Sequence, residues 1–153
     1  MPGDCRVLNF NPSRPGRSIQ EWKYGTVLQA AVARGYRDII ELLLKQQADV
    51  NAQGGEYGTA LQIAVGKGYA DIVNLLLKHG ANVNAKEWRY GTVLQAAAAE
   101  GLKDIVKLLL KYGADINAYG GLYGTALQAA LAKGHQDIVI LLLKHSADNN
   151  IPK

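Results

Sequence analysis

Tyr57-Gly58-Thr59-Ala60-Leu61-Gln62 decides the fold of this chain, because the same six positions return three more times, twice with valine in place of alanine. The other copies begin at Tyr24, Tyr90 and Tyr123, so the motif recurs at one constant spacing along the chain. A fixed period of this size, about 33 residues, is typical of stacked supersecondary units, in which each unit buries its apolar face only against its neighbours. The sequence therefore predicts a repeat architecture in place of an ordinary globular fold.

Each repeat is predicted to form two short helices. In the first copy, Thr26 precedes a short apolar segment that Gly35 ends, and a threonine there can accept a hydrogen bond from a free amide of the first helical turn. A second segment, residues 38–45, carries its apolar side chains in the i, i+4 rows of one helix face. Asp38 in its first turn and Lys45 in its last turn complement the helix dipole. Helices this short are marginal alone, so stacking between repeats must stabilise them.

A left-handed C-cap is expected where each second helix ends. Gly80 and Gly113 stand at this position in the second and third repeats, whereas Gln47 and Ser146 replace the glycine in the first and fourth. Keeping the left-handed conformation with a side chain costs about 1 kcal/mol. The Asp/Asn-x-Asn-Ala stretch that follows predicts a turn into the next repeat.

The repeated unit resembles the ankyrin repeat, a unit of about 33 residues that forms a turn and two helices with the signature Thr-Pro-Leu-His-x-Ala. The resemblance lies in Thr59-Ala60-Leu61-Gln62-Ile63-Ala64 and Gly80-Ala81-Asn82-Val83-Asn84-Ala85 and in their counterparts. Valine or alanine replaces the family's proline throughout, and glutamine replaces its histidine. Glutamine has both a donor and an acceptor, so it can still bridge neighbouring turns. The sequence of residues 120–130 is similar to that of ankyrin arrays common in filamentous fungi. The resemblance implies an all-α ankyrin-repeat solenoid of stacked helix-turn-helix units with protruding turns.

The expected organisation is an N-terminal tail or cap over residues 1–20 and an ankyrin-repeat domain over residues 21–153. The four repeats are expected at about 21–53, 54–86, 87–119 and 120–153. In the tail, Val7-Leu8-Asn9-Phe10 either cover the exposed side of the first repeat or belong to a disordered end, and both alternatives stay open. Residues 21–52 agree with 87–118 at 22 of 32 positions, which indicates that a block of two repeats was duplicated.

Composition argues against several classes of partner and site. Half of the net charge of +4 lies in residues 1–20, and the rest of the chain carries only +2, so no basic stripe predicts a nucleic-acid partner. No run of 18 apolar residues predicts a membrane span. The single Cys5 fits a reducing compartment, and the expected location is intracellular and cytoplasmic. The three histidines lack the spacing of a metal site, so neither a metal nor a cofactor is expected. The aspartates recur with the scaffold, which favours capping and turn roles over catalytic ones.

Residues that differ between neighbouring repeats are the candidates for recognition, since residues shared by every repeat serve the scaffold. At the turn tips these are Trp22, Lys23, Glu56, Trp88, Arg89, Tyr119 and Leu122. The resemblance implies that the exposed side of the first helices also binds, which adds Arg34, Lys67, Glu100 and Lys133. The tyrosines present in every repeat, Tyr24, Tyr57, Tyr90 and Tyr123, are expected to pack turn on turn.

The expected function is a non-catalytic protein–protein interaction through the concave face and the turn tips. The alternative is a small-molecule binder or an enzyme that uses the aromatic-lined concave face, with Glu56, Glu100 or Lys133 supplying polar contacts. Self-association through the C-terminal repeat is a further expectation, because Ile140 stands where the other second helices carry Glu41, Asn74 and Lys107. Solenoids need capped ends, so either residues beyond 153 or a partner would cover this face.

Overall fold

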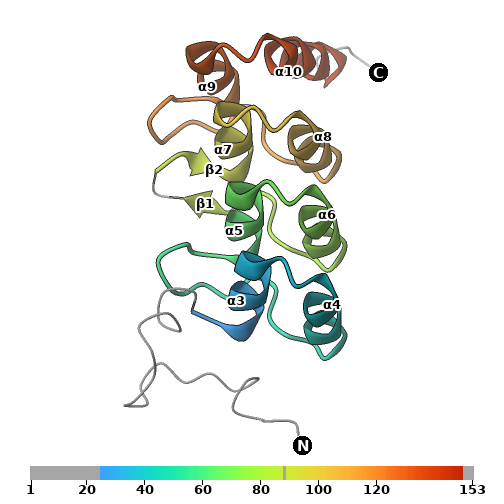
Figure 1. Cartoon of the computed structure of the whole chain (residues 1–153). Coiled ribbons are helices and arrows are strands. Elements are labelled where there is room, and N and C mark those ends of the chain that lie inside the picture. Colours follow the sequence, from blue (N-terminus) through green and yellow to red (C-terminus); the bar gives the residue numbers. More distant parts are fainter. Residues whose placement is uncertain (1–24, 88, 150–153) are drawn as a thin grey trace, which may run out of the picture. The chain divides into compact units, whose positions relative to one another are not determined.

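The computed structural model describes residues 25–87 and 89–149. The chain divides into two compact units between Ala81 and Asn82, and the described part of each unit holds two helix pairs (Figure 1). The helices of unit one are α3 (Val27–Arg34), α4 (Arg37–Lys45), α5 (Ala60–Lys67) and α6 (Ala70–Lys78). Those of unit two are α7 (Val93–Ala99), α8 (Lys103–Lys111), α9 (Ala126–Lys133) and α10 (Gln136–Asn149). Within each unit the first helices of the two pairs pack together, α3 with α5 and α7 with α9.

The first helix of each pair begins at a threonine. Its side chain accepts a hydrogen bond from the backbone N–H of the glutamine three residues later, and that glutamine accepts one from the threonine N–H. This reciprocal capping box satisfies free amides at the helix start. The four threonines are Thr26, Thr59, Thr92 and Thr125. Gly35 ends α3 in the left-handed conformation, so the predicted start and stop of this helix are confirmed.

The second helices follow the predicted charge pattern and differ at their ends. Each has an aspartate in its first turn, and α4, α6 and α8 have a lysine in the last. After α4, Gln47 keeps a left-handed φ of 64°, like Gly80 and Gly113 after α6 and α8. By contrast, α10 continues through Ser146 to Asn149. The left-handed conformation is therefore not kept at Ser146: serine enters that region less easily than glycine, and the helix goes on.

Aliphatic side chains fill the core of both units. The largest fully buried ones in unit one are Ile40, Leu61, Leu76, Val32, Val65 and Val73. In unit two they are Leu94, Ile105, Leu109, Ile138 and Leu142. Burying one such side chain contributes roughly 1.5–3 kcal/mol. Packing between helix pairs therefore supplies the stability that helices of eight or nine residues lack alone.

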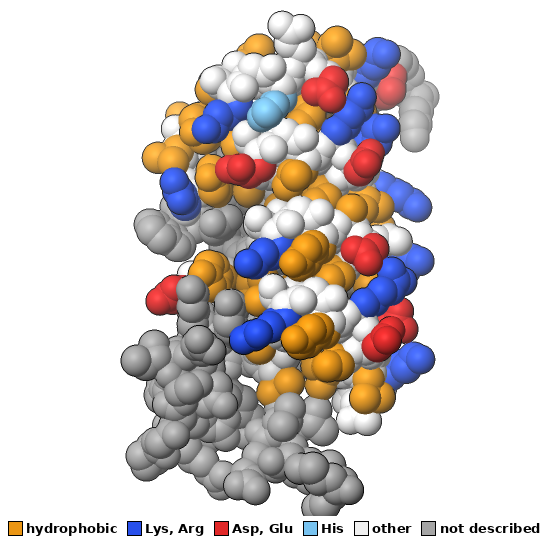
Figure 2. All heavy atoms as spheres, in the orientation of Figure 1, with side chains coloured by type: hydrophobic (Ala, Val, Ile, Leu, Met, Phe, Trp, Pro, Cys, Tyr) orange, Lys and Arg blue, Asp and Glu red, His pale blue; other side chains and the backbone are white. Residues whose placement is uncertain are grey.

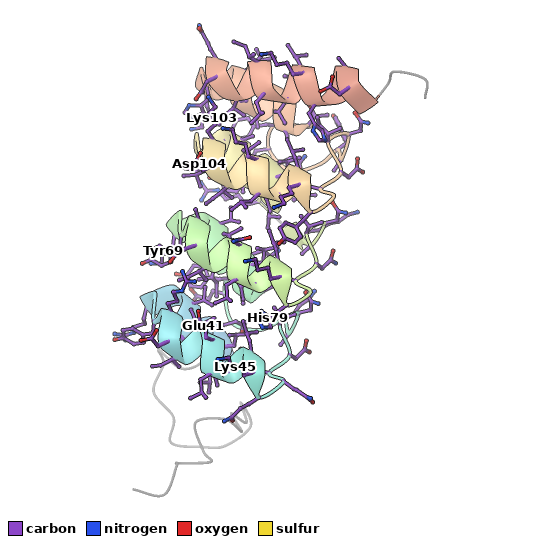
Figure 3. All side chains as sticks on the ribbon, turned by 90° about the vertical axis from the view of Figure 1, so that its right-hand side faces the viewer. Glu41, Lys45, Tyr69, His79, Lys103 and Asp104 are labelled. Atoms are coloured by element: carbon purple, nitrogen blue, oxygen red, sulfur yellow. The ribbon has the colours of Figure 1, made fainter. Side chains whose placement is uncertain are left out.

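Charged side chains of both signs cover the outer side of the second helices in each unit (Figure 2). Figure 3 looks onto these helices, with Glu41 and Lys45 on α4. Arg37 pairs with Glu41 at 3.2 Å and with Asp71 at 3.3 Å, and these hydrogen bonds raise the pKa of its guanidinium. Such exposed ion pairs contribute little to stability. None of the helices in the described part of the chain has the length and hydropathy that crossing a membrane requires.

Short polar turns connect the helix pairs. In three of them an Asp or Asn side chain accepts a hydrogen bond from the N–H of the asparagine two residues on, at 2.9–3.0 Å. The pairs are Asp49 with Asn51, Asn82 with Asn84, and Asp115 with Asn117. These Asx turns confirm the prediction. Beyond the turns the chain forms small hairpins: β1 (Lys86–Glu87) pairs with β2 (Gly91–Thr92), and single bridges join Gly54 to Gly58 and Gly120 to Gly124. The fold class is the predicted all-α ankyrin solenoid with protruding turns.

Candidate functional site

Buried glutamines tie the turn tips to the first helices. Gln95 of α7 is 2% exposed, and its Nε2 donates to the carbonyls of Ala118 and Gly120, both at 3.2 Å. Gln29 of α3 donates in the same way to the carbonyl of Ala52 at 3.1 Å. The prediction that glutamine bridges neighbouring turns is confirmed at both positions. The tips are therefore held by buried hydrogen bonds, which would be costly to leave unmade.

The two turn tips of unit two touch through their backbones. The Leu122 N–H donates to the Arg89 carbonyl at 3.1 Å. Gly121 lies so close to the neighbouring tip that an added Cβ would be 2.2 Å from the carbonyl carbon of Tyr90 and 2.6 Å from the nitrogen of Gly91. Its φ of +64° is also one that side chains rarely adopt. Only glycine fits at this position, so this part of the tip sequence serves packing.

An aromatic pair lies at the centre of the same tips. The rings of Tyr90 and Tyr123 stack with centroids 6.5 Å apart and an interplanar angle of 17°, and the Arg89 guanidinium lies 5.3 Å from the Tyr90 centroid. The Tyr90 hydroxyl donates to Glu100 Oε1 at 3.0 Å. Partial burial first, and then this hydrogen bond, raise the pKa of Tyr90 above its usual 10.0. The tip is thus linked through Tyr90 to the residue that ends α7.

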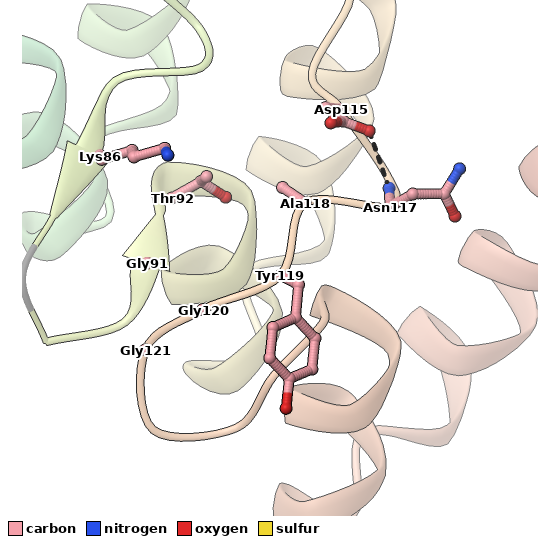
Figure 4. Close-up of a pocket in the computed structure, with 9 residues that line it drawn as sticks. All are labelled: Lys86, Gly91, Thr92, Asp115, Asn117, Ala118, Tyr119, Gly120 and Gly121. Atoms are coloured by element: carbon pink, nitrogen blue, oxygen red, sulfur yellow. Dashed lines mark hydrogen bonds between the residues drawn. The ribbon is translucent and has the colours of Figure 1, made fainter.

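Two apolar side chains stand out from these tips into solvent. Tyr119 is 82% exposed and Leu122 is 64% exposed. The Tyr119 ring lies beside Gly124, where an added Cβ would be 3.1 Å from ring atom Cε2. Figure 4 shows Tyr119 at the edge of a hollow between the β1–β2 hairpin and the next turn. The hollow is lined by Lys86, Gly91, Thr92, Asp115, Asn117, Ala118, Tyr119, Gly120 and Gly121.

Charged side chains of both signs line this hollow. Lys86 contributes a cation and Asp115 a carboxylate, which accepts from the Asn117 N–H at 2.9 Å (dashed line in Figure 4). Within residues 25–87 and 89–149, no three His, Cys, Asp or Glu side chains are grouped to hold a metal ion. No buried side-chain polar atom in that part of the chain is left without a partner. The hollow thus combines an exposed ring, backbone groups and charges of both signs.

The predicted binding residues of unit one lie on separate elements. Arg34 ends α3, Lys67 ends α5, and Glu56 lies in the turn tip before α5. All three are exposed. The predicted residues Trp22 and Lys23 lie outside the described residues. Unit one therefore offers exposed charge of both signs at these positions.

The predicted residues of unit two come closer together. Contacts through Tyr90 and the tip backbone join three of them, Arg89, Glu100 and Leu122. Tyr119 borders the hollow beside the same tips, and Lys133 is exposed at the end of α9. Trp88 lies outside the described residues.

Sequence reasoning missed Lys86 as a lining residue of the hollow. Lys86 stands at the position that Tyr119 occupies in the next repeat, and it differs from its counterparts there. This difference between repeats is the signal that could have identified Lys86 as a candidate. The expectation that the repeated tyrosines pack turn on turn is confirmed for Tyr90 and Tyr123 by their stacked rings.

Comparison with protein families identifies the scaffold. The model described as ankyrin repeats (3 copies) matches residues 5–87 and 87–153. A comparison with curated proteins found no match. Ankyrin repeats are generally protein–protein interaction modules, and the capped helix pairs with protruding hairpins described above have this architecture. The chain belongs to the ankyrin repeat family.

Proposed function

We propose that the chain is a non-catalytic protein-binding module that holds a protein partner on the turn tips and adjoining first helices of four ankyrin repeats. The observation that carries this proposal is the exposure of Tyr119 and Leu122, 82% and 64%, on a tip whose backbone is held in place. Exposed apolar side chains that lie together are typical of interaction sites. The tips of unit two are therefore the centre of the proposed surface.

The rigidity of this tip favours tight binding. The Leu122 N–H is bonded to Arg89, and Gly121 abuts the backbone of Tyr90, so the anchors need little ordering when a partner arrives. Binding that orders fewer groups loses less conformational entropy. Tyrosine also brings a large contact area with few rotors and one polar end.

Charged residues surround the two anchors in the proposed surface. Arg89, Lys86 and Lys133 supply cations, and Glu100 and Asp115 supply carboxylates. Charges at the rim of an interface steer encounter and orientation more than they add affinity. We therefore expect the anchors to determine how long the partner stays bound and the charges to determine how fast it arrives.

The test is partner capture from cell extract with three forms of the full chain. These are the wild type, the double variant Tyr119→Ala/Leu122→Ala, and the control Lys107→Ala/Lys111→Ala on the outer side of α8. Removing two anchors that each contribute about 2 kcal/mol should weaken binding by roughly a thousandfold. Quantitative mass spectrometry should find at least one protein retained by the wild type and the control and lost by the double variant.

Unfolding in urea provides the check on structure. Both anchors are exposed, so the double variant should keep the wild-type midpoint. Equal retention of every captured protein by all three forms would contradict the proposed surface.

A further inference from the structure

The last helix pair of unit two presents a bare apolar face. Leu131 on α9 and Ile140 and Leu143 on α10 are 59%, 54% and 52% exposed. We call these three residues the end face. The described part of the chain leaves them open to solvent, although each is an aliphatic side chain on a stable helix.

The corresponding face of the preceding helix pair is covered by the next pair. Ala98 and Leu110 occupy the positions of Leu131 and Leu143 in the preceding repeat, and they are 0% and 7% exposed because α9 and α10 pack on α7 and α8. At the end face, leucine replaces the buried Ala98, and Ile140 replaces Lys107, which is exposed beside the covered residues. The bare face is thus more apolar than the covered one, the opposite of what contact with water favours.

Unit one has exposed apolar residues at the positions with which a helix pair contacts the pair before it. Ile39 and Leu42 on α4 are 45% and 55% exposed. Ile138 of α10 stands at the position of Ile39 in its own repeat, and it is 0% exposed in the pair that packs on α7 and α8. Ile39 and Leu42, the α4 face, are therefore the residues with which a helix pair normally covers the pair before it.

The end of α10 differs from the ends of the other second helices. In the other repeats an Asx turn leads onward, as from Asp115 to Asn117. At the corresponding place α10 stays helical through Ser146 and Asp148.

We propose that a second copy of this chain covers the end face with its α4 face, head to tail. The contact would repeat the packing of one helix pair on the next within each unit. At the ion-pair position occupied by Arg37 with Asp71 and by Lys103 with Asp137, the junction would set Gln136 against Asp38 of the second copy. An amide donates to a carboxylate, so polar groups there would also match. A head-to-tail contact leaves a free face at each end and so extends into longer assemblies.

The test is sedimentation of the full chain, so that residues 1–24 are present in every measurement. The wild type should form dimers and larger species as concentration rises. Leu143→Lys blocks the end face and Leu42→Lys blocks the α4 face, and each variant alone should stay monomeric, with affinity at least tenfold weaker. A mixture of the two should form a dimer and stop there, because one intact end face then meets one intact α4 face.

Three other outcomes would overturn the proposal. They are a wild type that stays monomeric at every concentration, a mixture that stays monomeric, and a Leu42→Lys variant that still dimerises through like faces. Leu131→Lys, at the position of the buried Ala98, replaces Leu143→Lys if the latter lowers the urea midpoint. Tyr119→Ala/Leu122→Ala should leave association unchanged, so this test and that of the proposed function fail separately.

Discussion

Replacing Gly121 by alanine should separate the two turn tips of unit two. The new Cβ would lie 2.2 Å from the carbonyl carbon of Tyr90 and 2.3 Å from its oxygen, and backbone atoms cannot rotate away as a side chain can. The left-handed φ adds about 1–2 kcal/mol, and forcing the two backbones apart adds about 1–3 kcal/mol. The free energy of unfolding should therefore fall by about 2–5 kcal/mol.

Gly134→Ala is the matched control. Gly134 has a φ of +77°, close to the +64° of Gly121, but an added Cβ there meets no atom within 4 Å. The free energy of unfolding of the control should fall only by the cost of the left-handed backbone, about 1–2 kcal/mol. Urea denaturation gives both free energies, and amide hydrogen exchange at Leu122 reports directly on its bond to the Arg89 carbonyl. An equal loss of stability in Gly121→Ala and Gly134→Ala, with the Leu122 amide still protected, would contradict the close contact between the two tips.

Gln95→Ala should lower the free energy of unfolding by about 1–3 kcal/mol, more than the same change at the exposed Gln128, because it removes a buried side chain that donates to two partly buried carbonyls. Urea denaturation compares the two. The raised pKa of Tyr90 means that folding keeps its hydroxyl protonated, so this stabilisation is complete below pH 10.0 and is lost as pH rises above it. Tyr90→Phe should remove that part of the alkaline loss in a pH series of melts. Gly66 lies on the exposed side of α5, and a Cβ added there has no atom within 4 Å. Gly66→Ala should therefore raise the free energy of unfolding by about 0.5–1 kcal/mol in thermal or urea unfolding. A lower free energy of unfolding would show that the added methyl group meets other atoms.

Features that depend on neighbours in sequence were predictable. Thr59 and Gln62 lie three residues apart, so their spacing alone allows the reciprocal helix cap. The turn at Asp115 and Asn117 likewise needs only a carboxylate two residues before an amide. The constant period then implies that such units stack, which is why the fold class followed from the sequence.

Features that depend on contacts between repeats were not predictable in full. Differences between neighbouring tips were interpreted as signals of recognition, but Gly121, which stands where the preceding repeat has Trp88, is required by the backbone of Tyr90. Tyr119 and Tyr123 are the same residue type four positions apart, yet one is exposed and the other stacks on Tyr90. Only the tertiary arrangement separates these roles.

The end of α10 illustrates the same limit. Ser146 marked the absence of a glycine cap, and the sequence left open whether the backbone would turn at a cost or stay helical. The helix continues, which leaves the end face exposed beside it. Either outcome occurs at this position when glycine is absent, since Gln47 turns there in the first repeat.

Photo-crosslinking from single positions tests the proposed binding surface most directly. A photoreactive phenylalanine replaces Tyr119 in one form of the chain and Lys107, on the outer side of α8, in another. After irradiation in cell extract, a protein of defined mass should be joined to the chain from Tyr119 and not from Lys107. A lack of any adduct from Tyr119, or the same adduct from both positions, would contradict recognition through the tips of unit two.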